Sequence, residues 1–379
     1  MSVSIEPAAS ASHRNIIQES FCRGRLSSSD VLLIAFSGLG AHPHRPYDFE
    51  GLVDAAEYSV LLVRDLSNRW YQDVPEVEGG ALGLAQRLAT HARGYRRVVC
   101  LGFSMGGYAA LLFGRLLGAD AVLAFAPQTL LTEEGMAVLG DPRWSELIAE
   151  ARAVSATPRH LDLAETYAGG GVGRAKPSVV LCIPSRGDQL DSRHAHRLAA
   201  YGDVLELGAS PIGHTAFGVW LRESGALRRL IDAAAKGSPP NLCGVDERYE
   251  AWLAGLSHEL TVDPPAAWRW RPEGLRVSGT YRNLSPTPLR IESRPRERIR
   301  VGARLVGGAT ARPWPTEWRH DFAGETIPAG QSQPFHLDLN FSDLPEGRSV
   351  IMISLVREHC FWFCDLGFPR NEIEVVKSA

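Results

Sequence analysis

The clearest indication of this chain's fold is the segment Val98-Val99-Cys100-Leu101-Gly102-Phe103-Ser104-Met105-Gly106-Gly107-Tyr108-Ala109-Ala110. It begins with β-branched and apolar residues. After Gly-x-Ser-x-Gly-Gly, small and apolar residues continue at helical spacing, which predicts a buried strand, a sharp turn at Ser104 and a helix. Such a turn forces strained backbone angles on Ser104, and Gly102 and Gly106 allow neighbouring backbone to approach closely. We therefore expect the Ser104 hydroxyl beyond the end of the strand, beside the first N–H groups of the helix.

Similar apolar segments alternate with helical segments on both sides of this turn. Strands are predicted over residues 31–36, 58–63, 120–125, 177–183 and 203–207, and helices over 81–93 and 216–230. Residues 1–27 form a polar lead-in with an edge strand near 19–26. The alternation predicts an α/β domain over residues 28–236, with a doubly wound parallel sheet covered by helices on both faces. Residues 128–176 are longer than a crossover needs, so we expect them to form a lid.

A nucleophilic Ser104 needs a base and a carboxylate at other strand ends. Gly187-Asp188 follows the strand predicted over 177–183, and Gly213-His214-Thr215 follows the next strand. In this hypothesis His214 accepts the Ser104 proton, and Asp188 orients the imidazole and stabilises the imidazolium. Asp191 is the alternative acid, and Asp188 is preferred because it lies nearer the end of the strand.

Two backbone N–H groups are candidates for an oxyanion hole. The N–H of Met105 follows the nucleophile, and the N–H of Leu39 lies in Ser37-Gly38-Leu39-Gly40 after the first buried strand. An ordinary glycine turn explains the Leu39 loop equally well. Asp65, Trp70 and Tyr71 follow another strand and are weaker candidates for substrate binding, with packing under the lid as the alternative.

Residues 28–235 resemble the α/β-hydrolase family. The resemblance rests on Gly-Phe-Ser-Met-Gly-Gly around Ser104, on Asp188 and on Gly-His-Thr at His214. Ser37-Gly38 stands where many members have His-Gly. The resemblance implies hydrolysis or transfer of an acyl group through a serine ester, and it leaves the substrate open.

The sequence changes character after Lys236. Residues 237–272 begin with Gly237-Ser238-Pro239-Pro240 and are interpreted as a linker, and residues 273–379 show strands separated by turn signals. That spacing predicts an antiparallel β-sandwich. These strands are expected over 275–282, 289–293, 299–306, 333–341, 349–358 and 361–365.

The second domain resembles the immunoglobulin-like domain of bacterial polysaccharide-export ATPases and some glycosyltransferases. The most specific motifs are Ser354-Leu355-Val356-Arg357-Glu358 and Phe361-Trp362-Phe363-Cys364-Asp365-Leu366-Gly367. Because the export-ATPase relatives bind the exported glycan, the resemblance implies a saccharide-binding or positioning role. Trp362 is expected in the sandwich core, and Trp314 and Trp318 are candidates for stacking on sugar rings.

Composition limits the remaining classes of function. The 379 residues carry a net charge of −3 and are 45% hydrophobic, which gives no reason to expect nucleic acid as a partner. No apolar stretch reaches membrane-spanning length and no signal peptide is evident, so a cytoplasmic location is expected. The cysteine spacing predicts neither disulfides nor a metal site. His42 and His44 are interpreted as a solvated loop, and no cofactor is implied.

The sequence thus predicts a serine-dependent acyl hydrolase, a carbohydrate esterase or deacetylase acting on an acylated bacterial surface polysaccharide or its precursor. Polysaccharide-biosynthesis or export machinery is the expected partner. Two alternatives stay open: an acyltransferase that uses the same acyl-serine intermediate, and a non-catalytic glycan-binding protein.

Overall fold

A computed structural model describes residues 15–52, 57–169, 177–208, 212–243, 245, 248–292, 297–307, 316–358 and 360–377. The contacts divide the chain into two compact units. The N-terminal unit comprises Met1–Ala209 and Gly225–Val245, and the C-terminal unit comprises Ser210–Ser224 and Asp246–Ala379.

The N-terminal unit is built on an eight-stranded sheet with the order β1-β2-β4-β3-β5-β6-β7-β8. The pairings from β4 to β8 are parallel, and the β1–β2 and β2–β4 pairings are antiparallel. The strands are β1 (Asn15–Gln18), β2 (Cys22–Leu26), β3 (Val31–Phe36), β4 (Ser59–Val63), β5 (Arg97–Phe103), β6 (Ala121–Phe125), β7 (Val179–Ile183) and β8 (Asp203–Val204). This is the predicted α/β-hydrolase fold, and the sharp turn at Ser104 follows β5.

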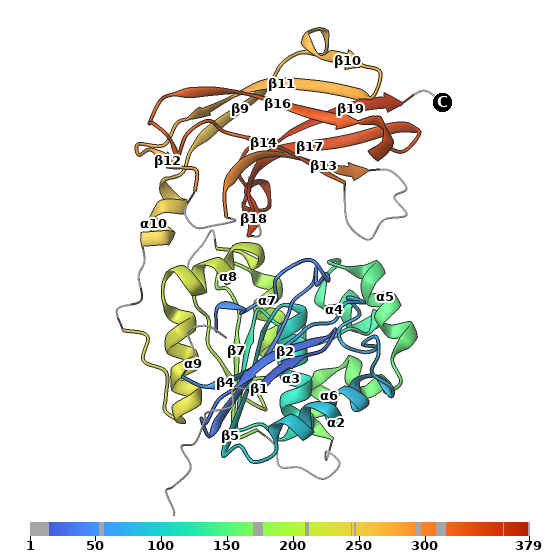
Figure 1. The fold of residues 1–379 in the computed structure, drawn as a ribbon, viewed down its shortest axis with the longest axis vertical. Helices are drawn as coiled ribbons and strands as arrows, with labels where there is room; N and C mark the ends of the chain where they lie inside the picture. Colours follow the sequence, from blue (N-terminus) through green and yellow to red (C-terminus); the bar gives the residue numbers. More distant parts are fainter. Residues whose placement is uncertain are drawn as a thin grey trace, which may run out of the picture. The chain divides into compact units, whose positions relative to one another are not determined.

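Burial explains why the central strands were recognisable from their sequences. Every residue of β3, β4 and β6 is buried, because helices cover both faces of a parallel sheet. Figure 1 shows α9 on one side of the sheet and α2, α3 and α6 on the other. The helices of this unit are α2 (Gly80–Ala92), α3 (Met105–Leu117), α4 (Glu133–Leu139), α5 (Ser145–Val154), α6 (Leu163–Ala168), α7 (Gln189–His196) and α9 (Ala226–Lys236), with the 3-10 turn η1 (Pro158–Leu161).

The C-terminal unit consists of antiparallel strands, as predicted. One sheet has the order β10-β11-β16 with β9 also paired to β11, another has the order β14-β13-β17-β18 with β19 paired to β17, and β12 pairs with β15. The strands are β9 (His258–Val262), β10 (Arg269–Arg271), β11 (Gly274–Asn283), β12 (Leu289–Arg290), β13 (Ile299–Gly307), β14 (Glu317–Asp321), β15 (Thr326–Ile327), β16 (Ser332–Asn340), β17 (Gly347–Arg357), β18 (Phe361–Trp362) and β19 (Asn371–Lys377). Helices α8 (His214–Glu223) and α10 (Arg248–Gly255) and the 3-10 turns η2 (Pro265–Ala267), η3 (Phe341–Asp343) and η4 (Phe363–Leu366) belong to this unit.

Aromatic side chains fill the interior of the C-terminal unit. Tyr281 of β11 lies 5.0 Å from Phe322 between ring centroids, and His258 of β9 lies 6.3 Å from Phe363 of η4. Trp362 is buried, as expected. The proposal that Trp318 stacks on sugars is wrong for this structure, since its side chain is buried as well, and Trp314 lies outside the described residues.

Three boundaries differ from those expected. Residues 237–272 contain β9 and β10, which both pair with β11 and so extend the C-terminal sheet. The helix expected over 216–230 is two helices, because Gly225 adopts a φ of 78° and ends the first one. The lead-in contributes the β1–β2 hairpin in place of one edge strand.

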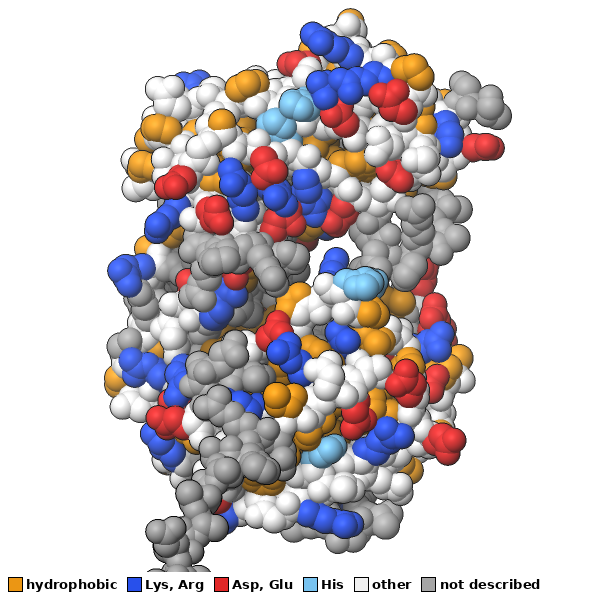
Figure 2. Space-filling view, in the orientation of Figure 1, with side chains coloured by type: hydrophobic (Ala, Val, Ile, Leu, Met, Phe, Trp, Pro, Cys, Tyr) orange, Lys and Arg blue, Asp and Glu red, His pale blue; other side chains and the backbone are white. Residues whose placement is uncertain are grey.

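The surface is mixed in charge. On the face seen in Figure 2, Lys and Arg side chains are interspersed with Asp and Glu side chains. Within the described parts of the chain, no helix combines the length and apolar character that crossing a membrane requires. All six cysteines are free thiols.

Candidate active site

Ser104 occupies the turn between β5 and α3 in a strained conformation. Its backbone angles are φ 56° and ψ −119°, a region that costs a non-glycine residue about 1–3 kcal/mol. The surrounding structure holds this turn, because the Ser104 N–H donates to the Phe125 carbonyl at 2.9 Å and the Ser104 carbonyl accepts from Tyr108 N–H at 3.0 Å. The sharp, strained turn predicted at Ser104 is therefore present, and the role of Ser104 as a nucleophile stays a prediction.

The glycines on either side of Ser104 permit this turn. A Cβ on Gly102 would lie 2.1 Å from the Gly106 carbonyl oxygen, and a Cβ on Gly106 would lie 2.2 Å from the Phe36 carbonyl oxygen. Both distances are far inside van der Waals contact. These glycines let β3, β5 and the start of α3 meet beside Ser104.

Some backbone N–H groups near Ser104 donate hydrogen bonds within the chain, and others have no acceptor among the described residues. In the loop after β3, Gly38 N–H donates to Asp48 at 2.8 Å, and Gly40 N–H donates to Asn68 at 2.8 Å. Across the described part of the chain, the N–H groups of Leu39 and Met105 have no hydrogen-bond acceptor. The Leu39 and Met105 amides are thus available to a developing oxyanion, and their role in an oxyanion hole stays a prediction.

The segment after β4 supports this loop. Asp65 is completely buried and accepts hydrogen bonds from the backbone N–H groups of Ser67, Arg69 and Tyr71 at 2.7–2.9 Å. Burial raises the pKa of Asp65, and these hydrogen bonds oppose that rise. The Tyr71 hydroxyl donates to the Ser37 carbonyl at 2.8 Å, so the turn organised by Asp65 is tied to the Leu39 loop.

The prediction that Asp65, Trp70 and Tyr71 bind substrate needs correction. All three residues are 0% exposed, and the Trp70 indole donates to Gln128 at 3.0 Å. They have no exposed surface with which to contact a substrate, so the packing alternative applies. Asn68, which the sequence analysis did not single out, accepts from two amides of the Leu39 loop. The only sequence signal that could have identified Asn68 is its position in the same turn as Asp65.

Asp188 is the N-cap of α7 and lies five residues after Ile183, the last residue of β7. Its carboxylate accepts the N–H groups of Leu190 and Asp191 at 3.0 Å each, and it lies 3.8 Å from Arg143. The alternative acid, Asp191, is fully buried with its carboxylate 2.9 Å from the same guanidinium. Asp191 therefore has a structural ion pair deep in the fold, while Asp188 caps a helix at the edge where parallel strands end.

A buried polar cluster beside Asp188 was not predicted. Asp141 pairs with Arg143 at 2.7 Å and with His194 Nε2 at 3.1 Å, and the side chains of Asp141 and His194 are fully buried. His194 Nδ1 accepts the Thr129 N–H, which places the ring proton on Nε2. Burial raises the pKa of Asp141, but the hydrogen bonds from His194 and Arg143 outweigh it and hold the pKa well below its usual range. No local sequence motif predicts this cluster, because its residues lie far apart in the sequence.

His214 is the first residue of α8, directly after Gly213 at the N-cap. By contacts α8 belongs to the C-terminal unit, whereas Ser104 and Asp188 belong to the N-terminal unit. The role of His214 as the base stays a prediction.

The expected lid, residues 128–176, contains α4, α5, η1 and α6 in its described part. Hydrogen bonds join it to the rest of the N-terminal unit. The Tyr108 hydroxyl donates to the His160 carbonyl at 2.5 Å, and the Ser155 hydroxyl donates to Gln72 at 2.8 Å. Within the described residues, no group of three or more His, Cys, Asp or Glu side chains is placed to hold a metal ion.

No protein-family model matches the sequence, and no curated protein matches it. Among solved structures, the chain is similar to the capsule O-acetyltransferase of Neisseria meningitidis serogroup A, with 15% identity, 59% of this chain and 94% of that chain covered, and a TM-score of 0.42. The esterase EstE5 shows 15% identity, coverage of 60% and 85%, and a TM-score of 0.40. The S-formylglutathione hydrolase FrmB of Staphylococcus aureus shows 14% identity, coverage of 59% and 100%, and a TM-score of 0.39. Likenesses this distant do not establish a shared activity, so the functional case rests on the residues of this chain.

Proposed function

We propose that this chain is a serine-dependent acyl-ester hydrolase in which Ser104 is the nucleophile, His214 the base and Asp188 the acid. The observation that carries the proposal is the strained conformation of Ser104 beside two backbone amides, of Leu39 and Met105, that have no acceptor among the described residues. Strain of this size persists where a site needs it, and unpaired amides near a hydroxyl suit a developing negative charge.

The proposed reaction proceeds in two stages. The Ser104 oxygen attacks the ester carbonyl carbon while His214 takes the hydroxyl proton, and the resulting oxyanion is stabilised by the Leu39 and Met105 amides. The carbon–oxygen bond to the leaving alcohol then breaks, and the alcohol takes the proton from His214. Water, activated by His214, releases the acyl group as a carboxylic acid and restores Ser104.

The proposed substrate is an acylated saccharide of a bacterial surface polysaccharide or its precursor. The motifs of residues 354–358 and 361–367 support it through their resemblance to glycan-binding domains. Trp270 of β10 adds a structural reason, because its side chain is 62% exposed and lies 6.0 Å from Phe341 between ring centroids. An exposed aromatic face of this kind suits stacking against a sugar ring.

A fluorophosphonate probe tests the nucleophile. The wild-type protein should gain the mass of one adduct, Ser104→Ala should gain none, and His214→Ala should react more slowly because the base that activates Ser104 is missing. Ser238→Ala, which removes an exposed hydroxyl elsewhere, is the matched control and should react like the wild type. An equal adduct yield in Ser104→Ala would refute the proposal.

An acyltransferase differs from a hydrolase in the group that accepts the acyl chain from Ser104, which is a sugar hydroxyl in place of water. With an activated acetyl ester, a hydrolase releases acetate at a rate independent of added saccharide. A transferase instead yields acetylated saccharide at the expense of acetate, because a sugar hydroxyl takes the place of water in the second stage.

A further inference from the structure

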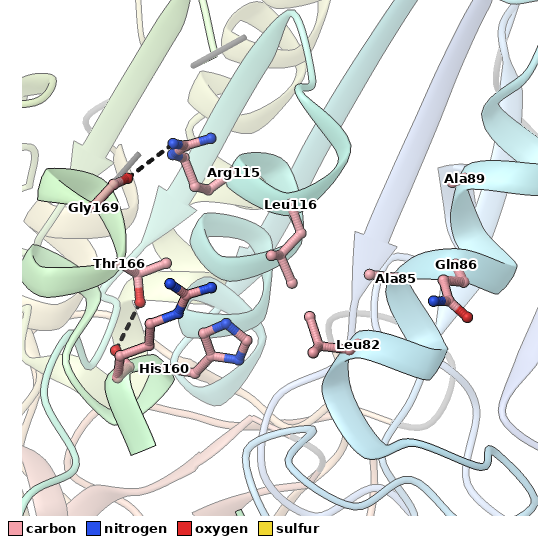
Figure 3. Close-up of a pocket in the computed structure, with 10 residues that line it drawn as sticks. Leu82, Ala85, Gln86, Ala89, Arg115, Leu116, His160, Thr166 and Gly169 are labelled. Carbon is pink, nitrogen blue, oxygen red and sulfur yellow. Dashed lines mark hydrogen bonds between the residues drawn. The ribbon is translucent and has the colours of Figure 1, made fainter. Parts of the chain in front are cut away.

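A pocket of about 400 Å³ lies in the N-terminal unit between α2, α3, η1 and α6. Figure 3 shows Leu82, Ala85 and Ala89 along one wall from α2 and Leu116 of α3 beside Leu82, while the Arg115 side chain points away from α2, toward Gly169. His160 and Thr166 come from the opposite side. The volume falls in the range typical of small-molecule sites.

This pocket is separate from the candidate active site. Arg115 follows Ser104 by eleven residues along α3, which corresponds to roughly 16 Å of helical rise. Neither Leu39 nor Met105 lines the pocket. It therefore requires its own explanation.

The pocket contains a buried positive charge. Arg115 is 4% exposed, its Nη2 donates to the Gly169 carbonyl at 3.1 Å, and its Nε has no hydrogen-bond partner. Arg159 brings a second guanidinium to the same pocket. Neither arginine has a carboxylate partner among the described residues. A buried charge without a counter-ion is costly, so an anion in this pocket would offset that cost.

His160 provides a second and independent indication of a ligand. Its side chain is 1% exposed, and neither ring nitrogen has a hydrogen-bond partner. Burial and the nearby Arg159 lower the pKa of His160 to about 4, so the neutral ring offers one N–H donor and one acceptor. Buried polar atoms are normally paired, which makes this orphaned ring a sign of a missing occupant.

We propose that this pocket binds a single-chain amphiphile with an anionic head group. The head group lies between Arg115, Arg159 and His160, where guanidinium N–H groups match the oxygens of a carboxylate or a phosphate. The chain lies against Leu82, Ala85 and Leu116, whose removal from water stabilises the complex. Carboxylate and phosphate heads share this chemistry, and the experiment separates them.

Calorimetric titration of the full chain with sodium octanoate, octyl phosphate, octanol and acetate tests the proposal. Octanoate or octyl phosphate should bind, and whichever binds more tightly identifies the head group. Octanol lacks the charge and acetate lacks the chain, so both should bind much more weakly. Equal affinity for octanol, or no binding of either anionic amphiphile, would overturn the proposal.

Two variants place the binding in this pocket. Arg159→Glu changes an exposed side chain and should weaken binding roughly tenfold or more, as expected when a hydrogen bond to a charged group is lost. Ala89→Phe should block the apolar part by filling it. Arg93→Glu, which makes the same charge change at an exposed position after α2, is the matched control and should bind like the wild type. Unchanged affinity in both pocket variants, with folding verified by circular dichroism, would refute the assignment.

Discussion

The carboxylate of Glu223, the last residue of α8, lies 3.2 Å from the guanidinium of Arg357 at the end of β17. Arg357 also lies 2.9 Å from Glu297, which in turn pairs with Arg222 at 2.7 Å. Arg357 is 3% exposed, so its own two ion pairs are largely shielded from solvent, whereas the Arg222 side chain is 35% exposed. The helix that begins with His214 is thereby fixed to the antiparallel sheet of the C-terminal unit.

Replacement of Arg357 by Met should therefore affect both stability and reactivity. Removal of Arg357 leaves Glu223 and Glu297 with Arg222 as their remaining cation, at 3.1 Å and 2.7 Å, so the cost should be below the about 3–5 kcal/mol of breaking an isolated buried pair. We expect a lower midpoint of urea unfolding and slower fluorophosphonate labelling, since α8 carries the proposed base.

Arg348→Met is the matched control for Arg357→Met. Arg348 lies on the same strand, β17, and pairs with Glu374, but its side chain is 67% exposed. Exposed pairs contribute about 0–1 kcal/mol, so this variant should keep the wild-type midpoint and labelling rate. Similar losses in both variants would argue against a special role for the Arg357 cluster.

Comparison of Ser104→Gly with Ser104→Ala should separate the effect of backbone strain on stability from the effect of losing the hydroxyl on reactivity. Ser104→Gly and Ser104→Ala both remove the hydroxyl and should both abolish labelling. Glycine adopts the φ of 56° without a steric penalty and alanine does not, so we expect Ser104→Gly to melt at a higher temperature than Ser104→Ala. Differential scanning calorimetry measures the difference, and equal melting temperatures would show that the turn is not strained.

The Asp141 cluster predicts a pH-dependent stability. The pKa of Asp141 is lower in the folded chain than the usual aspartate value of 3.8, because hydrogen bonds from His194 and Arg143 outweigh the opposing effect of burial. The stabilisation is therefore present above about pH 4 and is lost as the pH falls through the lower, folded value.

Asp141→Asn should remove that contribution. Urea midpoints of the wild type and the variant should differ most at neutral pH and converge below about pH 4. Asp30→Asn disrupts an exposed pair with Arg96 and should have a small effect throughout. A difference between wild type and Asp141→Asn that does not change with pH would contradict this explanation.

Trp270 should contribute to saccharide affinity if the C-terminal unit binds glycan. Trp270→Ala removes the exposed ring and should weaken binding of acetylated oligosaccharides in a glycan array or titration, while Trp270→Phe should retain part of it. Val376→Ala, an exposed apolar residue of β19, is the control. Loss of affinity in the control alone would exclude a stacking role for Trp270.

The sequence predicted the structure best in segments whose residue types are compatible with only one local structure. The fully apolar β3 and β6 fit only a sheet covered on both faces, and the glycines around Ser104 fit only a crowded turn. The strands β9 and β10 were missed because polar and charged residues in short segments do not show which strand will pair with them. Asp65 shows a second reason why the sequence did not predict the whole site. An aspartate at the end of a strand looks the same in the sequence whether its carboxylate binds a ligand or accepts hydrogen bonds from the backbone of a buried turn.

The order in which the chain visits its two units has an evolutionary consequence. It leaves the N-terminal unit after residue 209, returns at residue 225, and leaves again after residue 245. A recombination event with a single junction between the units would exchange the antiparallel sheets and leave α8 behind without Arg357. Functional exchange of the C-terminal unit therefore requires three junctions, after residues 209, 224 and 245, so the proposed histidine and the sheet that holds its helix are expected to be inherited together.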